Sequence, residues 1–285
     1  MKKRTKKYSN IRYRDHTEIE KTYINLYKQF CRACEISIVI SLNQGGIDTD
    51  GRGRRAADIF TRQVLTVHSL KKLLPVLRNG DDPEDTVWDL TTIALVSRSV
   101  MENFQALFFY GTETISESEA DLRFRIFQKD RNVKWRDIRM KAGESAEELE
   151  EFFTGLAEQQ KIIVNHEFYH SLSKEQKNSL KNRAEMYYSK AEFEAHCPRL
   201  ANIALHHQLL SNLAHPLPLA IHRIDEVSGH GSPSEADISL VVISLNVATH
   251  CLIASIEEMG KKFSDSIGKQ YQSMINELSD YPALN

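Results

Sequence analysis

Residues 238–256 read ISLVVISLNVATHCLIASI, which comes nearest in this chain to a membrane-spanning segment. The stretch is long enough to cross a bilayer. Asn246, Thr249, His250 and several serines interrupt it, however, and a helix that is apolar on most sides is also typical of the centre of a large bundle. We favour the second interpretation and expect no membrane partner.

The rest of the chain favours helices around this segment. Seven prolines and twelve glycines are few for 285 residues, and apolar residues recur at helical spacing over long segments. No window alternates convincingly between polar and apolar residues while also carrying hairpin turns. The sequence therefore predicts an all-α fold, a multi-helix bundle.

Start and stop signals divide the chain into three parts. Residues 1–16 form a basic tail, with five basic residues in the first seven; such a tail is usually solvated and flexible, and the alternative is a contact with RNA, DNA or an acidic membrane. Residues 17–55 predict a long helix and a glycine-rich loop, an arm suited to self-association as a homodimer. Residues 56–285 predict the helical bundle.

Composition limits the class of protein. The net charge of −2 makes no overall case for nucleic-acid binding, and 41% hydrophobic with 27% charged residues is ordinary for a globular protein. No apolar run follows the basic tail, so it is not a signal peptide. Four cysteines do not make a disulfide framework, and the Cys31–Cys34 pair lies inside an apolar helix, where buried thiols are expected. We expect a cytoplasmic protein.

A second stretch carries polar residues of interest. Residues 199–216 read RLANIALHHQLLSNLAHP and predict a helix that Pro216 ends, because proline lacks an N–H and restricts the residue before it. Gln208, Ser211 and His215 share one side of this helix with an alanine. This stripe is small and polar, whereas the buried side of an ordinary core helix is rich in leucine.

Three short motifs resemble those of a bacterial family of helical proteins of unknown function. Residues 97–110 (SRSVMENFQALFFY) are similar to its Arg-x-x-x-Glu helix, and residues 206–216 (HHQLLSNLAHP) to its Leu-Ser-x-x-x-His segment. Residues 165–176 (NHEFYHSLSKEQ) also look like its Asn-x-x-Phe-x-x-x-Leu segment. The likeness covers roughly residues 74–222 and implies a helical fold, with no established activity.

Residue by residue, this resemblance implies motif positions at Arg98, Glu102, Ser211 and His215. A weaker likeness is to the HEPN (higher eukaryote and prokaryote nucleotide-binding) ribonucleases, whose motif ends a helix with an arginine shortly before a histidine. The chain departs from that motif, since positions 208–210 hold no arginine. The likeness implies a protein that acts on nucleic acid or is associated with defence, in which Arg98 supplies a cation and His215 the acid–base group.

The same four residues also fit a protein without catalytic activity. Arg98 and Glu102 lie one helical turn apart and can form an exposed ion pair that contributes little to stability. His215 can interact with the carbonyl groups at the end of its helix. The chain would then be a helical scaffold or a module that binds another protein, with these residues paired and closed to solvent.

A third alternative rests on His166-Glu-Phe-Tyr-His170, an HExxH pattern. If both histidines share a helical face, they can bind zinc, with Glu167 as general base and Glu192 or a neighbouring side chain as third ligand. No glycine turn follows the pattern and no strand precedes it to hold a peptide. We therefore keep zinc as an alternative and expect no cofactor.

Overall fold

The computed structural model describes residues 16–77, 87–181, 186–197, 199–215 and 233–279. Within these ranges the chain forms eleven α-helices and two π-helical segments, with no strand. The prediction of an all-α, multi-helix protein is therefore confirmed. All of the basic tail predicted at residues 1–16 except His16 lies outside the described residues.

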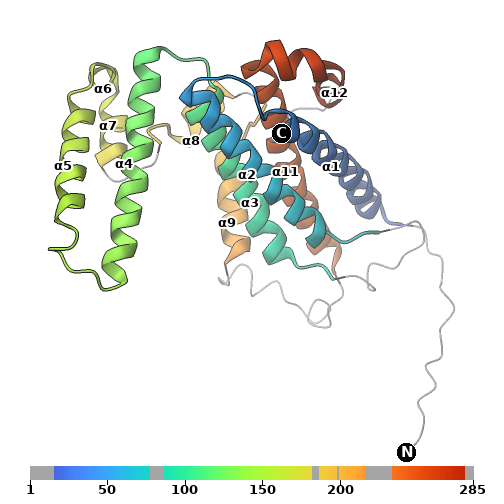
Figure 1. Ribbon diagram of the computed structural model, residues 1–285. Helices are drawn as coiled ribbons and strands as arrows, with labels where there is room; N and C mark the ends of the chain where they lie inside the picture. The colour runs from blue at the N-terminus through green and yellow to red at the C-terminus, as the bar shows by residue number, and fades with distance from the viewer. Residues whose placement is uncertain (1–15, 78–86, 182–185, 198, 216–232, 280–285) are drawn as a thin grey trace, which may run out of the picture.

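Helix α11 (Glu235–Lys262) lies at the centre of the bundle, between α1 and α3 (Figure 1). Ser234 caps its first turn in a reciprocal capping box with Asp237. By length and composition α11 could cross a membrane, but 78% of its most apolar stretch is buried inside the protein. Packing against neighbouring helices thus accounts for its apolar composition.

Helix α1 (Glu18–Asn43) belongs to the same core. Its residues Tyr23, Phe30 and Ile36 are fully buried, and the Tyr23 hydroxyl donates a hydrogen bond to the carbonyl of Pro75 at 2.6 Å. We expected residues 17–55 to form an arm beside the bundle. The structure instead places α1 within it, because one apolar face of this helix packs against α11 and α2.

Helix α2 (Gly51–Leu73) begins five residues before the predicted position and includes part of the expected glycine-rich loop. The side chain of Asp50 accepts a hydrogen bond from the backbone N–H of Gly53 at 2.6 Å. An aspartate at this position stabilises a helix start and here offsets the low helix propensity of two glycines.

Helix α3 (Leu90–Leu107) packs against α2 and α11 and continues into the π-helical segment η2 (Phe108–Thr112). In η2, Gly111 lies against α2: a Cβ atom at this position would be 2.8 Å from the Cβ of Ala56. Only glycine permits so close an approach. This contact joins the bundle to the segment that follows.

Four helices lie beside the bundle and build a second apolar cluster (Figure 1). They are α4 (Glu117–Lys141), α5 (Glu150–Val164), α6 (Glu167–Ser171) and α7 (Lys174–Lys181). The cluster includes Phe109 and Tyr110 of η2 and reaches Tyr187. Residues 56–285, predicted as one bundle, therefore hold two apolar clusters joined at η2.

The chain returns to the bundle through α8 (Lys190–His196) and α9 (Ile203–Ala214), which packs along α3. After α11, the segment η4 (Ser264–Gly268) and helix α12 (Lys269–Ser279) close the end of the bundle. The packing of α3, α8 and α9 determines which polar residues meet.

Candidate functional site

Arg98 and Glu102 form an ion pair on α3, with the Arg98 Nε atom 2.8 Å from the Glu102 Oε1 atom. The same oxygen lies 3.5 Å from the Nε2 atom of His207 on α9. Their side chains remain 26%, 45% and 27% exposed respectively, so water reaches all three. The packing of α3 against α9 thus joins a cation, a carboxylate and an imidazole at one half-exposed surface.

Ser211 lies one turn after His207 on α9. Its hydroxyl donates a hydrogen bond to the carbonyl of His207 at 2.6 Å, and its Oγ atom is 3.5 Å from the His207 Nδ1 atom. A serine that bonds the carbonyl four residues back is a common arrangement within helices. Since its proton is directed to the backbone, Ser211 is poorly placed to act as a nucleophile.

Lys190, the first residue of α8, completes this group. Its Nζ atom donates to the side-chain oxygen of the buried Gln105 at 3.3 Å. Burial lowers the pKa of Lys190, Glu102 raises it and Arg98 lowers it further. We call Arg98, Glu102, Gln105, Lys190, His207 and Ser211 the polar site.

The surroundings of His207 favour the uncharged form of its imidazole. Burial lowers the pKa of its imidazole, and the positive charges of Lys190 and Arg98 lower it further, while Glu102 opposes them. A neutral imidazole can accept a proton from a bound ligand. The site can therefore hold a negative charge on its two cations and take up a proton at His207.

His215, expected in this site, lies just past the end of α9 and is exposed. It is eight residues after His207, or about 12 Å along a helix axis. Among the described residues it has no hydrogen bond or ion pair with the polar site. Residues 207, 211 and 215 are spaced by four and so share one helical face. The spacing that pointed to Ser211 and His215 therefore also pointed to His207.

Arg123 on α4 is the centre of a second polar group, which the sequence did not predict. Its side chain is 1% exposed, and it donates to the Glu113 carboxylate at 2.6 Å, the Phe109 carbonyl at 2.7 Å and the Tyr188 hydroxyl at 2.7 Å. The guanidinium also lies 3.9 Å from the centre of the Phe109 ring. A buried arginine needs such a complete set of partners.

Two further residues complete the Arg123 network. Arg123 donates to Glu119 at 2.5 Å and to the Tyr187 hydroxyl at 2.9 Å, and Tyr187 itself donates to Glu119 at 2.6 Å. Burial works to lower the pKa of Arg123, but the surrounding tyrosines and carboxylates raise it on balance. The arginine stays charged.

The Arg123 network also helps to position the polar site, because it holds the residues next to Lys190 in the chain. Tyr188 directly precedes Ser189, whose hydroxyl caps α8, and Lys190 follows. Glu113 also accepts from Tyr188 and pairs with the half-exposed His196 of α8 at 2.7 Å. The network therefore anchors both ends of α8 and holds the start of that helix against α3.

The HExxH pattern does not form the expected arrangement. His166 precedes α6 as its N-cap residue, with Nδ1 accepting from the backbone N–H of Phe168 at 3.2 Å and Nε2 3.0 Å from Asp121. The expectation that His166 and His170 share a helical face is wrong, because only His170 lies within the helix.

The predicted third zinc ligand is also engaged elsewhere. Glu192 accepts from the backbone N–H of Ser189 at 2.6 Å and from Gln176 at 2.8 Å. In the part of the chain that the structure describes, no three histidine, cysteine or acidic side chains form a group able to hold a metal. The CxxC pair lies within α1, where burial raises the pKa of the Cys34 thiol to about 12.

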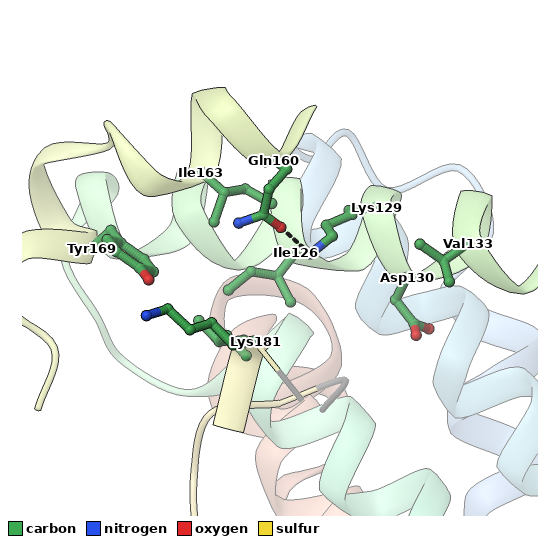
Figure 2. A pocket seen from close by; sticks show the side chains of 9 residues that line it. Ile126, Lys129, Asp130, Val133, Gln160, Ile163, Tyr169 and Lys181 are labelled. Atoms are coloured by element: carbon green, nitrogen blue, oxygen red, sulfur yellow. Dashed lines mark hydrogen bonds between the residues drawn. The ribbon is translucent and has the colours of Figure 1, made fainter. Parts of the chain in front are cut away.

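A small cavity of about 40 Å³ lies among α4, α5, α6 and α7, and its lining includes none of the predicted site residues. Figure 2 shows Lys129 and Gln160 joined by a hydrogen bond above Ile126, with Tyr169 and Lys181 to one side. Small-molecule sites commonly occupy some 300 Å³ or more. This cavity has room for water but not for a nucleotide.

Comparison with known proteins finds no family model, no curated protein and no solved structure that matches this chain.

Proposed function

We propose that the polar site binds single-stranded RNA and cleaves its phosphodiester backbone. The observation that carries this proposal is the meeting of Arg98, Glu102 and His207 from two helices at a half-exposed surface. Cleavage of RNA without a metal needs a group that takes a proton and cations that hold the phosphate charge. His207 then takes the acid–base role that the resemblance to HEPN ribonucleases assigned to His215.

The proposed reaction is attack of the ribose 2′-hydroxyl on the adjacent phosphorus. His207 accepts the hydroxyl proton, a P–O bond forms to the 2′-oxygen, and the bond from phosphorus to the 5′-oxygen breaks. Lys190, whose pKa burial lowers, donates a proton to the departing oxygen. The products are a 2′,3′-cyclic phosphate and a 5′-hydroxyl, and exchange of protons with water restores both side chains.

Arg98 and Glu102 have supporting roles in this proposal. The Arg98 guanidinium offers two or more N–H donors to the phosphate oxygens, whose charge grows in the transition state. Glu102 faces the Nε2 atom of His207, so it favours the tautomer that carries a proton there and leaves Nδ1 to act as the base.

Cleavage of a fluorescently labelled single-stranded RNA by the full chain tests the proposal. We expect His207→Ala to reduce the rate by about 100-fold or more, the usual effect of losing an acid–base group. His215→Ala, just past the end of the same helix, is the matched control and is expected to retain activity. A 2′-deoxy substitution at the cleaved position should block the reaction. Absence of cleavage by the unaltered protein, or equal rates with and without His207, would overturn the proposal.

A non-catalytic helical module that binds another protein is the second candidate. The observation that favours it is that the polar site is already paired: Arg98 bonds Glu102, and Ser211 bonds the carbonyl of His207. This candidate predicts no RNA cleavage by the unaltered protein under any condition of pH or salt. The same assay therefore separates the two functions.

A further inference from the structure

The outer part of the α4–α5 hairpin has very little core of its own. Between residues 127 and 162, only Leu149 and Leu156 are buried. Two helices without a third packing partner are stabilised mainly by helix propensity, which is marginal in water. Helices of this length normally gain their stability by burying an apolar face against other elements.

Large apolar side chains are exposed along this hairpin instead. Trp135 is 55% exposed and Ile138 56% exposed, and both line a groove of about 690 Å³ together with Phe127 and Phe152. Phe153 on α5 is exposed as well. A set of exposed aromatic and aliphatic side chains of this kind marks a surface that packs against another protein.

The charges of the hairpin indicate the occupant. Residues 125–141 carry seven basic and two acidic side chains, whereas residues 142–151 carry five acidic and none that is basic. The basic stretch is the outer part of α4, and the acidic stretch leads into the first turn of α5. The hairpin therefore carries an apolar groove and, toward its tip, a basic and an acidic segment that complement each other, with Arg139 and Glu144 already paired within the chain.

We propose that a second copy of this chain docks on the α4–α5 hairpin, so that two hairpins form a four-helix bundle. With the two-fold axis along the hairpins, each α4 lies beside the α5 of the other copy. The basic end of one helix then faces the acidic start of the other, and Trp135 and Ile138 enter the shared core. Helix α4, at 25 residues, is about 37 Å long, enough for a stable two-fold interface.

Sedimentation equilibrium of the full chain over a wide concentration range tests this inference. We expect the mass of a dimer for the unaltered protein and that of a monomer for Ile138→Glu. Leu65→Glu is the matched control, because Leu65 is exposed on α2 and outside the hairpin. Circular dichroism of each variant confirms that the helices remain folded.

A charge exchange distinguishes docking from general loss of stability. Lys134→Glu combined with Lys141→Glu should weaken the dimer, and Glu150→Lys combined with Glu151→Lys should do the same. Mixing these two double variants should restore a mixed dimer, since each basic segment again meets an acidic one. A monomer at every concentration would overturn the inference.

Discussion

The Nε2 atom of His207 lies 3.5 Å from the Oε1 atom of Glu102, and this contact links helix α9 to helix α3. Glu102 and His207 are far apart in the sequence, and only the packing of α9 on α3 brings their side chains together. Burial lowers the pKa of His207 most, Lys190 and Arg98 lower it further and Glu102 raises it, so residues of α3 and α8 influence its charge state.

Substitutions around His207 should move its pKa in opposite directions. Glu102 raises this pKa and Arg98 lowers it, so Glu102→Gln is expected to lower it further and Arg98→Met to raise it. Titration of the His207 ring by NMR measures both effects. An unchanged His207 titration in Glu102→Gln would show that the contact does not persist in solution.

Acid should destabilise the fold through His250 on α11. Burial lowers the pKa of this histidine from 6.5 to about 4, with smaller contributions from Arg199 and His206. The unfolded chain therefore binds more protons than the folded one between these values, and stability falls as the pH drops from about 6.5 to about 4. The loss from this group is at most about 3 kcal/mol. Urea unfolding across this range measures it, and His250→Leu should flatten the dependence.

Removal of the Arg123 charge should have a large effect on stability. Arg123→Met leaves Glu113 and Glu119 without their cation in a buried setting, and we expect the free energy of unfolding to fall by about 3–5 kcal/mol. Arg125→Met is the control on the same helix. Its ion pair with Asp121 is exposed, so it should change stability by about 1 kcal/mol or less. Similar losses in both variants would contradict the assignment of Arg123 as the centre of a buried network.

Two glycine-to-alanine substitutions should change the stability of the protein in opposite directions. Gly111→Ala places a Cβ atom 2.8 Å from the Cβ and 2.9 Å from the Cα of Ala56, and overpacking of this kind lowers stability by about 1–3 kcal/mol. Gly155→Ala meets nothing within 4 Å on α5 and should raise stability by up to about 1 kcal/mol. Thermal unfolding compares the two. Ala56→Gly combined with Gly111→Ala should recover part of the loss.

The sequence by itself determined the helical class. Ser116, Ser189 and Ser234 each cap the helix that follows, because a capping hydrogen bond joins residues three apart and needs no distant partner. The interpretation of residues 238–256 as a core helix was also sound in its main point, since α11 is largely buried in the bundle.

Tertiary structure alone decided the polar groups. The Arg123 network draws on η2, α4 and residues 187–188, segments that are up to 75 residues apart in its hydrogen bonds, and no local spacing encodes that meeting. Likewise, the pairing of Arg98 with Glu102 follows from a separation of one turn, but the addition of His207 required α9 to pack on α3. Hydrogen bonds between residues close in the chain determine where helices form. The packing of helices that are distant in the chain determines which side chains share a site.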